Sequence, residues 1–190
     1  MLTSFSTDLL FSLTHTDDDL HRLYQLFPDA SSIVKTDVAT DKAGADYVAT
    51  YYDGQQETID VKRRRPGCER YWQSPNVPEL ALELVADVDA NRPGWAVADS
   101  NVPDWFVFAF PSRTVLLDAD DLREAVRMHQ DEWSAHYGVR ESVSECDGRV
   151  WAAQWVPVPL PVVQAAIDEI HPSKEPERPP WVLPRKLRRI

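Results

Sequence analysis

Cysteine is scarce in this chain, and its spacing excludes two classes of small protein. Cys68 and Cys146 are far apart, and neither belongs to a CxxC pair in the 190 residues. A structural zinc site or a disulfide framework needs more cysteines at closer spacings. We therefore expect the two thiols to be buried or incidental.

Long apolar runs are missing as well. No stretch reaches the roughly 18–20 uninterrupted apolar residues that cross a bilayer. The N-terminal sequence MLTSFSTDLLFSLTHTDDD has no early Lys or Arg, and acids follow it closely, unlike a secretory signal peptide. Seven tryptophans and a hydrophobic content of 43% can nevertheless fill a sizeable core. We expect one compact domain that is cytoplasmic and has no membrane partner.

Basic residues are outnumbered, with 20 Lys and Arg against 31 Asp and Glu for a net charge of −11. This balance argues against non-specific nucleic-acid binding by the whole surface. Residues 174–190 differ, because their six basic and two acidic side chains give +4 and leave −15 on the rest. Such a proline-containing tail is either a nucleic-acid arm or a solvated, partly disordered terminus. We therefore divide the chain into a domain over 1–172 and a Pro-rich basic tail over 173–190.

Apolar periodicity predicts a mixed order of helices and strands. Helical spacing predicts helices over 16–27, capped by Thr16 or Asp17, over 118–136, capped by Asp118, and over 161–170. Alternating or continuous β-forming runs predict strands over 45–52, 57–63, 79–86, 104–110, 113–117 and 149–156. Residues 33–38 are a short strand or a loop, and 64–78 are loop-like. The order predicts an α/β fold in the broad sense, more closely of the α+β type. We expect a mixed sheet flanked by helices, in which residues 104–110 form a buried central strand.

The strands over 45–52 and 57–63 are expected to form a hairpin, because Asp53-Gly54 lies between them. Alternation along the second strand places Asp60 and Lys62 on one face and Val61 on the other.

The number of residues in the hairpin loop decides where Asp46 lies. A three-residue loop, Asp53-Gly54-Gln55, puts Asp46 opposite Lys62, whereas a two-residue turn sends it to the wrong face. We predict an odd or bulged hairpin that brings Asp46 to the face of Asp60 and Lys62.

These residues have the chemistry of a divalent-metal site. Mg²⁺ or Mn²⁺ prefers carboxylate oxygens, a carbonyl and water, which Asp46, Asp60 and the main-chain carbonyl of Val61 can supply. Lys62 can orient an attacking water or stabilise the negative charge that builds on a phosphate during hydrolysis. The sequence contains no GxSxG, P-loop, GxGxxG or HExxH motif that would favour other chemistry.

At this point the chain resembles the PD-(D/E)XK nuclease superfamily, through a helix, a hairpin that carries Asp46, then Asp60-x-Lys62, further strands and a helix. The resemblance covers roughly residues 16–136, and Gly94-Trp95 with the strand at 103–107 is similar to the part after the signature in some members. It implies a restriction-endonuclease-like core and Mg²⁺-dependent cleavage of DNA, by an endo- or exonuclease. Asp46 and Asp60 would then be metal ligands and Lys62 the catalytic lysine. Ala45 departs from the proline that is frequent at its position.

Three further groups of residues are candidates for the same site. Arg63, Arg64 and Arg65 either contact phosphates beside the metal or form a solvated strand end. Many members of the family carry a glutamate on the first helix, and here Asp17 is the favoured counterpart among three consecutive aspartates. Glu83 is a further possible acid, although we expect it to face solvent.

Two other functions are compatible with the sequence. The first is a catalytically inactive nuclease-fold module that binds or scaffolds, and the second is an acidic interaction protein, for instance of a phage or mobile element. The acidic balance of residues 1–173, with 29 acids and 14 bases, favours the first because it should repel a DNA duplex. The sequence leaves the oligomeric state open, a homodimer included.

Overall fold

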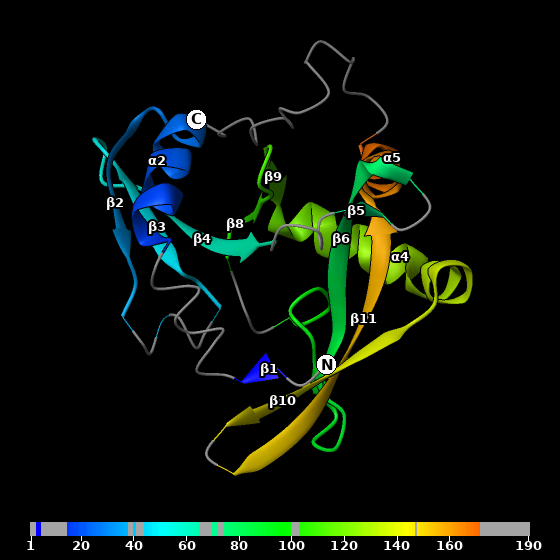
Figure 1. Cartoon of the computed structure of the whole chain (residues 1–190). Helices are drawn as coiled ribbons and strands as arrows, with labels where there is room; N and C mark the ends of the chain where they lie inside the picture. The colour runs from blue at the N-terminus through cyan, green and yellow to red at the C-terminus, as the bar shows by residue number, and fades with distance from the viewer. Residues whose placement is uncertain are drawn as a thin grey trace.

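The computed structural model describes residues 3–4, 15–37, 40, 44–64, 70–71, 74–99, 103–146 and 148–171. The predicted tail over 173–190, Arg65 and Cys68 lie outside this part of the chain. Its elements, shown in Figure 1, are β1 (Thr3–Ser4), α2 (Thr16–Leu26), β2 (Ala30–Lys35), β3 (Tyr47–Tyr51), β4 (Gln56–Arg63), β5 (Arg70–Tyr71), β6 (Ser74–Asp87), β7 (Arg92–Pro93), β8 (Trp105–Ala109), β9 (Thr114–Asp118), α4 (Ala119–Tyr137), β10 (Arg140–Cys146), β11 (Arg149–Pro159) and α5 (Leu160–Ile170).

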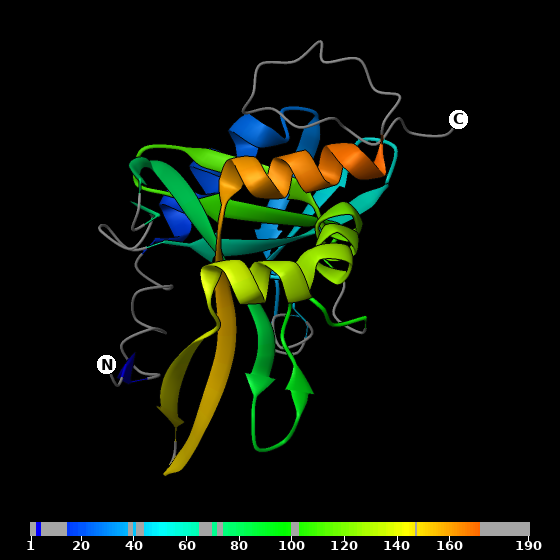
Figure 2. The same ribbon diagram turned by 90° about the vertical axis from the view of Figure 1, so that its right-hand side faces the viewer.

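The described strands form two sheets, whereas the sequence predicted one. A five-stranded sheet has the order β2-β3-β4-β8-β9, in which only β4 and β8 run parallel. A second sheet has the order β1-β10-β11-β6-β5, and β7 pairs with β6. The α+β class is confirmed. Strands β10, β11 and β6, however, belong to a second sheet and do not extend the first. Figure 2 shows the β10–β11 and β6–β7 hairpins extending beyond helices α4 and α5.

Strand β8 joins the two hydrophobic cores. Phe106 and Phe108 lie in the larger core, with residues of β6, β9, β11, α4 and α5. Trp105 and Val107 lie in the smaller core, with residues of α2, β2, β3 and β4. All five residues of β8 are buried, as the continuous apolar run predicted for a central strand.

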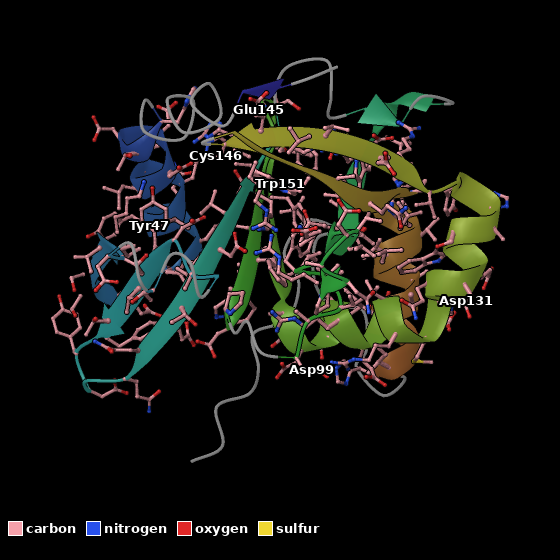
Figure 3. The ribbon with its side chains drawn as sticks, turned by 90° about the horizontal axis from the view of Figure 1, so that it is seen from below. Tyr47, Asp99, Asp131, Glu145, Cys146 and Trp151 are labelled. Carbon is pink, nitrogen blue, oxygen red and sulfur yellow. The ribbon has the colours of Figure 1, made fainter. Side chains whose placement is uncertain are left out.

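Figure 3 shows the two sides of the molecule. Tyr47 is on the side of the five-stranded sheet that α2 covers, and the exposed Asp131 is on α4 at the opposite side. Glu145, Cys146 and Trp151 lie together near the tip of the β10–β11 hairpin, where Ser144 pairs with Trp151.

Several element boundaries differ from the sequence prediction for local reasons. The first helix begins after His15, which makes no side-chain capping bond, so neither Thr16 nor Asp17 is its N-cap. The second helix is capped by Asp118 as predicted, because its side chain accepts hydrogen bonds from the backbone of Asp120 and Asp121. The segment over 64–78, predicted as a loop, contains β5 and the start of β6.

Candidate functional site

The β3–β4 hairpin has the odd loop that the site requires. Thr50 pairs with Gln56, and the backbone N–H of Tyr51 donates to Gln55 at 2.9 Å, which leaves a three-residue loop over 52–54. Gly54 has a φ of 82°, the left-handed conformation typical of this loop. The odd register is confirmed, and the loop lies one residue earlier than predicted.

This register places Asp46 next to the Asp60-Val61-Lys62 tripeptide. Tyr47 pairs with Ile59 as the last regular pair of this hairpin, so Asp46 lies just before β3 and is not opposite Lys62. The Asp46 carboxylate accepts a hydrogen bond from the backbone N–H of Val61 at 2.8 Å, and its own N–H donates to the Ile59 carbonyl at 2.8 Å. Asp60 and Lys62 share the face of the sheet that points away from α2, and the Asp46 carboxylate is near enough to Lys62 to help raise its pKa.

Asp60 and Lys62 form an ion pair on that face, with Lys62 Nζ 2.7 Å from Asp60 Oδ2. Asp60 is buried, with 5% of its surface exposed. The Lys62 ammonium also lies 4.9 Å from the ring centroid of Trp95 and 6.0 Å from that of Phe106. An ammonium over an aromatic ring is attracted by the negative face of the ring, so three neighbours fix the end of this lysine.

Strand β6 supplies a further acid to the same place. Glu83 is half-buried among Lys62, Asp60 and Arg92, and the backbone of Trp95 donates a hydrogen bond to its carboxylate. The prediction that Glu83 faces solvent is wrong, whereas its selection as a possible additional acid agrees with its place beside Lys62.

The charges within the site shift the pKa values of Lys62 and Glu83. Burial lowers the pKa of Lys62, but the carboxylates of Asp60, Asp46 and Glu83 outweigh it and hold this pKa above its usual value. Burial raises the pKa of Glu83, and Lys62 acts against that rise. The lysine is therefore held in its charged form.

Arg123 from α4 lies beside Phe106 and Trp95, the two aromatic neighbours of Lys62. It is 4% exposed, its guanidinium lies 5.3 Å from the Phe106 ring centroid, and its Nε donates to the Trp95 carbonyl at 3.5 Å. Burial lowers the pKa of Arg123, while Asp120 and Asp60 support its charge. Arginine retains its proton in proteins, so the site holds a second cation.

The acid on the first helix is Asp19, and the selection of Asp17 is wrong. Asp17 is exposed in the first turn, whereas Asp19 is buried and forms an ion pair with Arg63. The Tyr47 hydroxyl also donates to Asp19, at 3.3 Å. Arg63 thus fastens α2 to β4, on the opposite face from Lys62.

Arg64 lies two residues beyond Lys62 and on its face. Its guanidinium is 3.5 Å from Glu79 of β6, which is 4% exposed. Burial raises the pKa of Glu79, and Arg64 and Arg140 act against that rise. Both described residues of the predicted arginine run are therefore partnered by acids, and the third, Arg65, lies outside the described residues.

Trp95 and Arg123 are the site neighbours that the sequence did not single out. Trp95 follows Gly94, a pair noted only for its resemblance to the family, and Arg123 sits in an ordinary helical pattern. Both are brought to the site by packing between elements distant in sequence. Asp19, on the other face of the sheet, carries no signal that separates it from Asp17.

The donor set fits a hard divalent cation in part. Asp60 on β4 and Asp46, which is bound to the backbone of the same strand at Val61, offer two carboxylates of the kind that such an ion requires. No group of three or more His, Cys, Asp or Glu side chains in the described residues is arranged to hold a metal ion. The two aspartates must therefore be completed by a carbonyl and water.

Helices in the described residues are all too short or too polar to cross a membrane. Comparisons with protein-family models, with curated proteins and with solved structures find no match. Function is therefore inferred from the geometry of Asp46, Asp60 and Lys62.

Proposed function

We propose that this protein is a divalent-metal-dependent nuclease that hydrolyses phosphodiester bonds of DNA, with Asp46, Asp60 and Lys62 as its active site. The observation that carries this proposal is the odd β3–β4 register, which brings the Asp46 carboxylate to the Val61 backbone, between Asp60 and Lys62. An even register would have turned Asp46 away from this tripeptide. Helix α2 before the β2-β3-β4 meander and the parallel pairing of β4 with β8 support a restriction-endonuclease-like core.

Each residue has a distinct role in the proposed reaction. Asp46 and Asp60 would hold Mg²⁺ or Mn²⁺, with the Val61 carbonyl as a further candidate ligand. A bound ion of this kind lowers the pKa of water and offsets phosphate charge. Lys62, fixed as a cation, stabilises the charge that develops on the phosphate oxygens. Arg123 adds a second positive charge at the Asp60 end of the site.

DNA must reach this site through an acidic surface. Arg63 and Arg64 are already partnered by Asp19 and Glu79, so neither presents an unopposed charge to a phosphate. Arg64 is the better candidate to contact phosphate, because it lies on the face of Lys62 and its 3.5 Å ion pair is loose. In this role the Arg64 guanidinium would leave the Glu79 carboxylate and bind a phosphate of the substrate.

The second candidate function is a non-catalytic member of the same fold that binds or scaffolds, for instance an acidic phage or mobile-element interaction protein. The 2.7 Å ion pair between Lys62 and Asp60 favours it, because this pair occupies an aspartate that a metal would need. The charge of −15 outside the C-terminal tail also favours it.

Cleavage of plasmid and single-stranded DNA by the full chain with Mg²⁺ or Mn²⁺ tests the proposal. We expect Lys62→Ala to lower the cleavage rate by about 10²–10³-fold, the usual cost of losing one charge-stabilising donor. Lys35→Ala is the matched control, because Lys35 is an exposed lysine on β2. Equal cleavage by wild type and Lys62→Ala would end the proposal. No cleavage by the wild type with either ion would leave the non-catalytic reading.

A further inference from the structure

The end of the Lys62 side chain is enclosed by groups from several elements. Asp60 lies on its own strand, Trp95 follows β7, Phe106 is on β8, and Glu83 faces it from β6. A lysine ammonium on its four-carbon stem ordinarily samples many positions. Here the surrounding groups restrict it to one side of the Trp95 ring.

Glu83 and Trp95 behave as one structural unit. The Trp95 backbone donates to the Glu83 carboxylate, and the Ala96 N–H donates to the Glu83 carbonyl at 3.2 Å. Gly94 permits this approach, since a Cβ added there would lie 2.2 Å from the Glu83 carbonyl oxygen. We call Glu83, Gly94 and Trp95 the lysine clamp.

Helix α4 holds the clamp in place. Arg123 Nε donates to the Trp95 carbonyl at 3.5 Å, and Arg127 forms an ion pair of 3.1 Å with Asp99, at the end of the same turn. Figure 3 shows Asp99 beside α4, on the side of the molecule opposite the β10–β11 hairpin tip. The clamp is therefore attached to α4 and to the larger core, against which Trp95 packs.

We propose that Glu83 and Trp95 are positioning residues that hold Lys62 as a fixed cation beside Asp46 and Asp60. The charged groups that face Lys62 are Asp46 from the start of β3, Asp60 from β4 and Glu83 from β6, with Arg123 of α4 on the far side of Asp60. In the nuclease reaction Lys62 then stabilises negative charge and does not take the proton of the attacking water. This catalytic part rests on the proposed function, whereas the placement of Lys62 does not.

Competitive acetylation of the metal-free full chain, read by mass spectrometry, tests the clamp without any substrate. The reagent must reach the amine beside the Trp95 ring, so the readout is the labelling of Lys62 divided by that of Lys35 in the same molecule. In the wild type we expect a ratio well below one. Trp95→Leu should raise it about two- to fivefold, the scale of one cation–π contact, and Trp95→Phe should not.

The Glu83 variants test the other half of the clamp. Glu83→Gln weakens the hydrogen bond from the Trp95 backbone to this side chain, so the Trp95 ring should cover Lys62 less and the labelling ratio should rise about two- to fivefold. Glu83→Asp keeps a carboxylate acceptor and should restore part of the protection. An unchanged ratio in both Glu83→Gln and Trp95→Leu would overturn the proposal. Lys35 is already exposed, so its labelling corrects for the reagent and not for loosening of the fold, which urea unfolding of each variant measures.

DNA cleavage by the same variants separates the two proposals. A raised labelling ratio in Glu83→Gln and Trp95→Leu, with no cleavage by the wild type, supports the clamp and refutes the nuclease. Cleavage that survives with an unchanged ratio refutes the clamp and supports the nuclease. If the wild type cleaves DNA and the variants raise the labelling ratio, Glu83→Gln should lower kcat and leave KM within about twofold, since Glu83 acts through Lys62.

Discussion

The carboxylate of Asp46 accepts a hydrogen bond of 2.8 Å from the backbone N–H of Val61, so the first acid of the site is tied to the strand that carries the second. This bond continues the β3–β4 pairing beyond its last regular residue pair, Tyr47 with Ile59. Asp46 therefore has both a structural role, as a backbone acceptor, and a chemical one, as a carboxylate beside Asp60.

Substitutions at Asp46 can separate these two roles. Asp46→Asn retains an oxygen for the Val61 N–H, so we expect a loss of stability within about 1 kcal/mol. Asp46→Ala leaves the N–H without that acceptor and should cost about 1–3 kcal/mol. Both should abolish metal-dependent cleavage if Asp46 is a ligand. Urea unfolding and plasmid cleavage measure the two effects, and an Asp46→Asn protein with wild-type cleavage would exclude the ligand role.

The ion pair of Asp19 and Arg63 should contribute strongly to the docking of α2. Its side chains are 9% and 14% exposed, and removing one partner of such a buried pair leaves an uncompensated charge. We expect Asp19→Ala to destabilise the protein by about 3 kcal/mol, measured by urea unfolding.

A double-mutant cycle shows whether this cost belongs to the pair. Asp19→Ala with Arg63→Ala should be less destabilised than the sum of the single variants, because neither charge is then left alone. Strict additivity would contradict the coupling. Asp17→Ala is the matched control, and at this exposed position we expect a change within about 0.5 kcal/mol.

Glu79 should make the free energy of unfolding depend on pH in a definite direction. Burial raises its pKa above the ordinary value of 4.5, so between 4.5 and the raised value the folded state keeps a proton that the unfolded state has lost. The stability that Glu79 contributes is present below pH 4.5 and is lost as the pH rises through the raised pKa.

The test is the difference between wild type and Glu79→Gln, which has no carboxyl group to titrate. We expect the free energy of unfolding of the wild type, minus that of Glu79→Gln, to fall as the pH increases from 4.5 toward 7. Urea unfolding at several pH values measures this difference. A difference that stays constant or grows with pH would mean that Arg64 and Arg140 outweigh burial at Glu79.

Local sequence signals were sufficient for the features that depend on a few neighbouring residues. Asp53-Gly54 indicated the β3–β4 hairpin, Asp118 marked the start of α4, and the apolar run over 104–110 indicated the buried strand β8. The face shared by Asp60 and Lys62 follows from alternation along β4. In each case the determining interactions lie within about a dozen residues.

Features set by long-range packing could not be predicted in this way. Strand β10 has the sequence RESVSEC, which lacks an apolar pattern, and it forms because β11 pairs with it. The glutamates of β6 alternate with Leu80 and Leu82, but nothing local shows that Arg64 and Lys62 lie opposite them. Asp17 and Asp19 are equally good first-turn acids, and only the position of Arg63 distinguishes them.

Gly94 offers a steric test of how the lysine clamp is built. An added Cβ would lie 2.2 Å from the Glu83 carbonyl oxygen and 2.5 Å from its carbonyl carbon, and these backbone atoms cannot rotate away. We expect Gly94→Ala to separate the turn from β6 and to destabilise the protein by about 1–3 kcal/mol, the usual cost of overpacking. Urea unfolding measures this cost, and the labelling of Lys62 should rise because Trp95 moves with the turn.

Gly54→Ala is the control that separates a steric clash from backbone strain. Its Cβ would meet nothing within 4 Å, but its φ of 82° disfavours a side chain, so a cost of about 1 kcal/mol is expected. Because Gly54 lies in the hairpin loop and not in the clamp, Lys62 labelling should stay at the wild-type level. If both variants changed the labelling equally, the response at Gly94 would reflect general destabilisation. A rise confined to Gly94→Ala would mean that the close approach of this turn to Glu83 is what holds the lysine.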